Sequence, residues 1–205
     1  MPIDEDTDSY RTISSPASAK FTEKMSRFMS FAHPVDDASQ VRALVAKYQK
    51  EYHDARHVCW AYVAGSDRSE QYSNDNGEPS GTAGKPILGQ INSLNLTNVA
   101  VVVVRYFGGI KLGTPGLIAA YREAARLALE EAPQVTRHAM QSLTFTFPYQ
   151  SMNAVMTVAK MPEIETLDRH FDCTCRMTLA TRAGLMTELI SRISSIDGTS
   201  LLSSD

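Results

Sequence analysis

The stretch VAVVVVRYFGGIKLGTPGL, residues 99–117, contains the strongest structural signal in the sequence. Its first six residues are all apolar, a pattern typical of a central strand that is covered on both faces. A glycine-rich segment follows at residues 108–116, and residues 117–129 then carry apolar side chains at helical spacing. The sequence therefore predicts a buried strand, a tight loop and a long helix in this order.

A second glycine-rich segment, NDNGEPSGTAGKP at residues 74–86, precedes another short helical pattern. Eight of the chain's 11 glycines lie between Gly77 and Gly116. Both segments contain Gly-Thr-x-Gly at the start of a predicted helix. We expect Thr114 to be the N-cap of the long helix with Pro115 at its first position, and Pro86 to open the shorter helix.

Two helix N-termini could jointly hold an anion, since each presents unpaired N–H groups and about half a positive charge. Neither segment has the spacing of a Walker A or Rossmann motif. The candidate anion- or RNA-binding residues are Lys85, Arg105, Lys111, Thr82, Gly84, Thr114, Gly116 and Tyr106. The competing interpretation is that the glycines only allow tight turns and close helix packing.

Catalytic and metal sites are weaker alternatives. His57 and Cys59 share one strand face and could form a nucleophile pair, but no third group is evident to orient the histidine. Carboxylates of Asp54, Asp75 and Glu78 could bind a hard cation.

The same acidic residues have structural interpretations. Asp75 and Asn76 are expected to cap a turn, and Glu78 to pair with an arginine such as Arg56 or Arg105. We therefore predict no catalytic residue, no metal ligand and no cofactor.

Composition limits the classes of function. The chain has 205 residues, 43% of them hydrophobic, and a net charge of −3. Four acids near the N-terminus leave the rest of the chain at +1, which gives no global attraction to nucleic acid. The start lacks the features of a signal peptide, and the longest apolar run is far below the roughly 18 residues of a membrane helix. Cys59, Cys173 and Cys175 form no disulfide framework, so we expect a protein of the reducing cytoplasm with no membrane contact.

The predicted fold class is α+β with two domains. Residues 1–19 are expected to be a flexible tail, and residues 20–135 an N-terminal domain. In that domain, residues 21–32 are predicted as one strand with Met25 and Arg27 on an apolar face, where Arg27 needs a carboxylate such as Glu78. A helix at residues 41–52 is expected to be capped by Asp36 or Asp37.

Residues 138–205 follow the order βαββαβ, which favours a ferredoxin-like domain. Cys173 and Cys175 are expected to point into its core. The domain boundary is predicted between Ala132 and Gln141.

Three segments together resemble the IMPACT/YigZ family: residues 54–57 (DARH), 74–86 and 102–117. The match covers about residues 20–132 in order. The family positions matched here are Arg56, His57, Asp75, Gly77, Glu78, Pro79, Gly81, Thr82, Gly84, Pro86, Arg105, Tyr106, Gly108, Gly109, Gly113 and Gly116. Asn76 stands where the family usually has a second aspartate, which weakens the case for a metal. Some relatives are labelled as proline dipeptidases, but no ligand set for that chemistry is present.

The resemblance implies a ribosomal protein S5 domain 2-like N-terminal domain and a ferredoxin-like C-terminal domain similar to the last domain of elongation factor G. Eukaryotic relatives restrain a translation-control kinase. The implied function is a non-catalytic protein associated with translation, whose partner is the ribosome, RNA or an acidic protein of the translation apparatus. Two alternatives are an enzyme or small-anion binder that uses Glu78 or His57, and an interaction module anchored by Tyr106 and Phe107.

Overall fold

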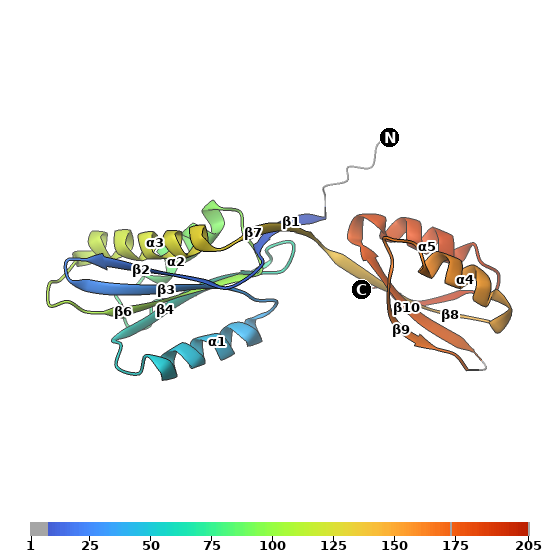
Figure 1. Cartoon of the computed structure of the whole chain (residues 1–205), viewed down its shortest axis with the longest axis horizontal. Coiled ribbons are helices and arrows are strands. Elements are labelled where there is room, and N and C mark those ends of the chain that lie inside the picture. The colour runs from blue at the N-terminus through green and yellow to red at the C-terminus, as the bar shows by residue number, and fades with distance from the viewer. Residues whose placement is uncertain (1–7, 173, 205) are drawn as a thin grey trace. The chain divides into compact units, whose positions relative to one another are not determined.

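The computed structural model of the chain describes residues 8–172 and 174–204, in two compact units (Figure 1). Tyr10–Arg137 forms the N-terminal unit. Residues 138–172 and 174–204 form the C-terminal unit together with Asp8 and Ser9. No helix in the described part of the chain is long and apolar enough to cross a membrane.

The N-terminal unit is built on a five-stranded antiparallel sheet. Its strand order is β2 (Ala17–Glu23), β3 (Ser26–Pro34), β6 (Val99–Tyr106), β4 (His57–Ala64) and β5 (Glu70–Asn74). The prediction of a central strand covered on both faces is confirmed, since Val101 and Val103 lie in one core cluster and Val102 and Val104 in another.

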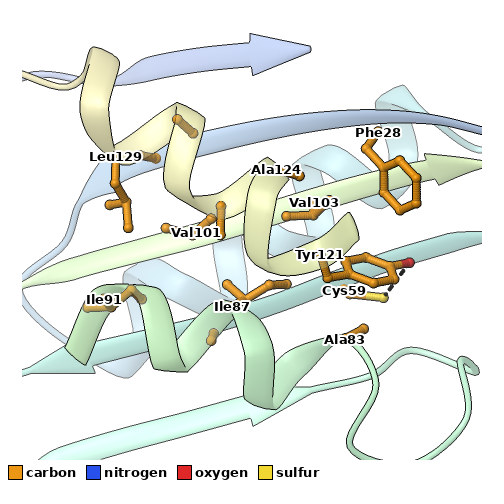
Figure 2. Packing of buried hydrophobic residues seen from close by; sticks show 14 of the residues in the cluster. Phe28, Cys59, Ala83, Ile87, Ile91, Val101, Val103, Tyr121, Ala124 and Leu129 are labelled. Carbon is orange, nitrogen blue, oxygen red and sulfur yellow. Dashed lines mark hydrogen bonds between the residues drawn. The ribbon is translucent and has the colours of Figure 1, made fainter. Parts of the chain in front are cut away.

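Helices α2 (Gly84–Ser93) and α3 (Gly113–Glu131) cover one face of this sheet, and α1 (Ala38–Glu51) covers the other (Figure 1). Asp37 caps α1 by accepting hydrogen bonds from the amides of Ser39 and Gln40. It is one of the two residues, Asp36 and Asp37, that the sequence predicts as the cap. Figure 2 shows Ile87 and Tyr121 of the two helices packed over the valines of β6. The hydroxyl of Tyr121 reaches the thiol of Cys59 on β4.

The predicted tail is wrong where the structure describes it. Residues Ser9–Ile13 form β1, which pairs with β7 (Gln134–His138), and Ile13 is fully buried. Residues 1–7 lie outside the described part of the chain. Strand β7 was not expected from the sequence, and neither was β5.

The single strand predicted at residues 21–32 is also wrong. The chain turns at Lys24 and Met25, both with positive φ, and Met25 is 70% exposed. Arg27 is exposed as well. Its guanidinium lies over the Tyr106 ring at 5.2 Å from the centroid, so it does not pair with Glu78.

The C-terminal unit has the predicted βαββαβ order. Its elements are β8 (Met140–Phe147), α4 (Met152–Ala159), β9 (Glu165–His170), β10 (Cys175–Arg182), α5 (Met186–Ser194) and β11 (Ser200–Ser204), with single 3-10 turns before the two helices. The sheet order is β11-β8-β10-β9, and each pairing is antiparallel. Cys175 is buried in the core as expected, whereas Cys173 lies outside the described residues.

Asp8 contributes a buried carboxylate to the C-terminal unit. It accepts hydrogen bonds from Arg182 Nη2 at 2.8 Å and from the amide of Gly184 at 3.0 Å, and His138 Nδ1 lies 3.3 Å away. The Arg182 hydrogen bond is the main reason that the pKa of Asp8 lies below its ordinary value.

Candidate functional site: a cleft between the two glycine-rich loops

A cleft of about 500 Å³ opens in the N-terminal unit where the two glycine-rich segments meet. Its walls are formed by Arg56, His57, Gly77, Glu78, Pro79, Arg105, Phe107, Lys111, Leu112, Gly113, Thr114 and Leu117. Three of these side chains are cationic (Arg56, Arg105 and Lys111) and one is a carboxylate. The lining is therefore net positive.

A buried ion pair lies at the wall of this cleft. Arg105 Nη1 donates a hydrogen bond to Glu78 Oε1 at 2.6 Å, and the hydroxyl of Tyr121 donates to the same oxygen at 2.8 Å. The side chains of Arg105 and Glu78 are only 6% and 3% exposed. The expected pairing of Glu78 with an arginine is confirmed, and that arginine is Arg105.

His57 is held beside this pair. Its Nδ1 donates to the carbonyl of Asn76 at 2.9 Å, which leaves Nε2 facing Glu78 Oε1 at 3.9 Å. Asn76 also accepts a hydrogen bond from the amide of Val58 through Oδ1, so this residue ties the first loop to β4. His57 thus positions the loop that carries Glu78.

Cys59 does not supply a nucleophile here. It is fully buried, its thiol donates to the carbonyl of Asp75 at 3.0 Å, and the hydroxyl of Tyr121 lies 3.3 Å away. Burial raises the pKa of Cys59 to about 12, which disfavours the reactive thiolate. The alternative of a Cys59–His57 nucleophile pair is therefore wrong.

Asp75 occupies the N-terminus of α2. Its carboxylate accepts hydrogen bonds from the amides of Gly81, Ala83 and Gly84 at 2.8, 3.0 and 2.8 Å. Burial alone would raise the pKa of Asp75, but these amides and the nearby charge of Lys85 hold it below its ordinary value.

The hydrogen bonds of Asp75 show that one part of the predicted anion site, the start of α2, is already occupied. The amide of Gly84 is already bound to Asp75, and the buried hydroxyl of Thr82 donates to the carbonyl of Pro79 at 2.6 Å. Pro86 is the third residue of α2 and does not open it. Among the described residues, no cluster of three or more His, Cys, Asp or Glu side chains is placed to hold a metal ion.

The N-terminus of α3 is different, because no side chain among residues 8–172 and 174–204 caps it. The N-cap position is Leu112, and the first turn contains no acidic residue. Thr114 is therefore not the N-cap that the sequence predicts. It lies in the first turn of α3 and lines the cleft beside Lys111. The first amides of an α-helix lack an intrahelical acceptor, and Gly113 and Thr114 of this turn are exposed and line the cleft.

Lys85 and Tyr106 do not join this cleft. Lys85 lies with Arg122 in a separate groove of about 370 Å³ along α2 and α3. Side chains alternate along β6, so Tyr106 faces the α1 side of the sheet while Arg105 faces the opposite side. The hydroxyl of Tyr106 donates to Asp54 Oδ1 at 2.7 Å. The eight predicted binding residues are thus divided among different places.

Phe107 lines the cleft, whereas the sequence indicates only that it could anchor a partner. Its ring is 48% exposed, and its centroid lies 5.7 Å from the guanidinium carbon of Arg105. Arg56, expected only as a signature position, is exposed and lines the same cleft. Side chains alternate between the two faces of a strand, so the sequence of β6 indicates which face of the sheet Arg105 is on. This alternation gives no information on Phe107, which lies in the loop after the strand.

Two glycines of the signature have clear packing roles. A Cβ on Gly108 would lie 2.0 Å from the backbone of Met25, and its amide donates to Ser26 Oγ at 3.3 Å. A Cβ on Gly84 would lie 2.7 Å from the amide nitrogen of Asn74. These glycines bring the β2–β3 turn and β5 close to the two loops, and so shape the cleft.

A family model described as the Impact N-terminal domain matches residues 24–129, slightly more than half of the chain. The chain belongs to the IMPACT family. The IMPACT family member YigZ of Escherichia coli is 31% identical over 180 residues, which cover 87% of this chain and 88% of that protein. The IMPACT family member YvyE of Bacillus subtilis is 36% identical over 141 residues, covering 69% and 65%.

A solved structure described only as a hypothetical protein is similar to this IMPACT-family chain over both units. It superposes with a TM-score of 0.78 at 28% identity, and the match covers 96% of this chain and 98% of the other. The resemblance to the IMPACT/YigZ family is thereby confirmed, and so is the α+β class.

Proposed function

We propose that this IMPACT-family protein is a non-catalytic protein of the translation apparatus, and that its cleft binds RNA on the ribosome. One observation carries the proposal. Arg56, Arg105 and Lys111 line one cleft together with the start of α3, and the carboxylate among the lining residues, Glu78, is already paired with Arg105. Such an arrangement attracts an anion.

The domain assignments support a role in translation, because the family resemblance relates the two units to domains of a ribosomal protein and of an elongation factor. The order β11-β8-β10-β9 and the βαββαβ connectivity are those of a ferredoxin-like domain, and we assign the C-terminal unit to that class. We assign the N-terminal unit to the ribosomal protein S5 domain 2-like class on the family resemblance. A protein of this kind works in the cytoplasm, where ribosomes are.

The charge distribution limits the size of the contact. The chain as a whole has a net charge of −3, so attraction to RNA is local to the cleft and not spread over the molecule. The two exposed cations of the cleft are Arg56 and Lys111, because Arg105 is paired with Glu78. The logarithm of the binding constant should therefore fall with the logarithm of the salt concentration with a slope of about −1.4. A broad basic surface would give a much steeper slope.

Co-sedimentation with ribosomes and with ribosomal RNA across a salt series tests the proposal. The test variant is Arg56→Ala/Lys111→Ala, in which both side chains are exposed and line the cleft. The matched control is Lys85→Ala/Arg122→Ala, which removes the same charge from the separate groove.

We expect salt-sensitive binding by the natural protein and the control, and a loss of about tenfold or more in the cleft variant. Absence of binding at low salt would refute the proposal. Equal losses in both variants would also refute it, because the contact would then be unspecific. Binding to ribosomes that survives removal of accessible RNA would point to an acidic protein partner instead.

A further inference from the structure

We infer that the cleft takes a single nucleotide, with its phosphate at the start of α3 and its base against Phe107. The inference rests on the proposed function and deepens it by naming the chemical unit that the cleft recognises. A free nucleotide and the end of an RNA chain share this chemistry.

The lining of the cleft includes the guanidinium of Arg105. Arg105 is 5% exposed, and its Nε is buried without a hydrogen-bond partner among the described residues. Its Nη1 is used by Glu78, and its Nη2 reaches Ser26 Oγ only at 3.4 Å. This Nε is inaccessible from the cleft, but Arg105 lines the cleft, and its positive charge favours an anion bound beside it.

The first turn of α3 supplies further donors at the same place. No side chain in the described part of the chain caps this 19-residue helix, and Thr114 of its first turn lines the cleft. Lys111 lies three residues before Thr114 in the chain, lines the same cleft and is exposed. Backbone amides at a helix start, together with Arg and Lys, are the usual donors for phosphate oxygens.

Apolar side chains also line the cleft. Pro79, Leu112 and Leu117 line it, and the half-exposed ring of Phe107 lies beside the guanidinium of Arg105. An inorganic anion would leave these surfaces unused. A base can stack on the aromatic ring while its phosphate stays within reach of the cations.

The size of the cleft favours one nucleotide. A volume of about 500 Å³ falls within the range of about 300–1,000 Å³ that is typical of small-molecule sites. Grooves that follow single strands without sequence preference hold about 4–16 nucleotides per domain, which is more than a cleft of this volume can take. The ligand is therefore a mononucleotide or a chain end.

Calorimetric titration of the full chain with AMP, GMP, CMP and UMP tests the inference, with inorganic phosphate and adenosine as partial ligands. We expect at least one nucleotide to bind about tenfold more tightly than either partial ligand. Short RNA oligonucleotides with a 5′-phosphate, a 3′-phosphate or no terminal phosphate distinguish a chain end from a free nucleotide. Phosphate binding as tightly as every nucleotide would overturn the inference, and so would no nucleotide or oligonucleotide binding at about 10 mM.

Variants at two exposed positions test where the ligand binds. Phe107→Ala and Lys111→Ala should each weaken nucleotide binding by about tenfold, because they remove the stacking surface and a charged donor. Lys85→Ala, an exposed lysine of the other groove, should leave it unchanged. Nucleotide binding that both cleft variants retain would overturn the inference.

Ribosome co-sedimentation separates this inference from the proposed function. Ribosome binding through the cleft without any affinity for nucleotides or oligonucleotides would refute the inference alone. Nucleotide binding in the cleft without ribosome binding would support the inference as a free-nucleotide site and refute the proposed role at the ribosome.

Discussion

The guanidinium of Arg105 and the carboxylate of Glu78 meet at 2.6 Å and join the end of β6 to the first glycine-rich loop. The hydroxyl of Tyr121 on α3 binds the same carboxylate oxygen. One acidic side chain therefore connects the central strand, a loop and a helix beneath the cleft. The shape of the cleft depends on this connection.

Replacing Glu78 by Gln should destabilise the N-terminal unit strongly. The change keeps the shape of the side chain but leaves the buried charge of Arg105 without a counter-ion. We expect a loss of about 3–5 kcal/mol in the free energy of unfolding. Urea unfolding followed by the fluorescence of Trp60, the only tryptophan in the chain, measures this loss in the N-terminal unit.

Glu130→Gln is the matched control. Glu130 also pairs with an arginine, Arg126, but its side chain is 51% exposed. Exposed ion pairs contribute about 0–1 kcal/mol, so this variant should unfold close to the natural protein. Equal unfolding of the two variants would show that the Arg105–Glu78 pair has no special role.

Gly108→Ala should destabilise the unit by about 3 kcal/mol, because its Cβ would lie 2.0 Å from the backbone of Met25. Gly89→Ala provides the comparison. A Cβ at Gly89 meets no atom within 4 Å, and the residue lies inside α2, so alanine should stabilise it by up to about 1 kcal/mol. Thermal unfolding of both variants checks the opposite signs. A neutral Gly108→Ala would contradict the close packing of the second loop on the β2–β3 turn.

The C-terminal unit should lose stability in acid through Asp8. The pKa of Asp8 is lower in the folded protein than its ordinary value of 3.8, chiefly because Arg182 donates to it. The folded state therefore gains stability from Asp8 above about pH 4, and this gain is lost as the pH falls below that value.

Asp8→Asn should remove this part of the pH dependence. Amide hydrogen exchange of β8 and β10, measured between about pH 3 and pH 6, reports the stability of the C-terminal unit itself. We expect the natural protein to lose protection in acid and the variant to be less protected near pH 6 with a flatter profile. Identical profiles would contradict the contribution of Asp8.

Cys59 should resist alkylation in the folded protein. Its thiol is fully buried with a pKa raised to about 12, so very little thiolate forms near pH 8. Iodoacetamide treatment followed by peptide mass spectrometry should find Cys59 unmodified in native buffer and modified in concentrated urea. Rapid modification in native buffer would revive the interpretation of Cys59 as a nucleophile.

The sequence predicts those features that depend on short patterns. The apolar run at residues 99–104 indicates a buried strand, and the helical spacing after it indicates α3. The Asp37 cap follows from local chemistry at the start of α1. The pairing of Glu78 with an arginine follows from the cost of leaving a buried charge alone.

Features that depend on distant pairing are not visible in the sequence. Strand β1 is fixed by β7, and the amide of Ser14 bonds the carbonyl of Pro133, which is 119 residues away. Strand β5 carries mostly exposed polar side chains, so it lacks an apolar pattern. The turn at Met25 is hidden because a methionine there continues the apolar alternation.

The candidate site was predicted in part for the same reason. The sequence places Arg105, Lys111 and Thr114 near each other, since they are close in the chain. It gives no information on the direction in which α2 carries Lys85. Nor does it show that Asp75 already occupies the amides of that helix, because this contact depends on how residues 74–84 fold back.

Hydrogen–deuterium exchange of the protein alone and with ribosomes tests the central claim most directly. The account predicts slower exchange in residues 107–117, which contain the second loop and the first turn of α3, while residues 85–90 of α2 exchange at an unchanged rate. Protection that appears only in the C-terminal unit, or no protection at saturating ribosome concentration, would contradict the claim that the cleft is the binding site.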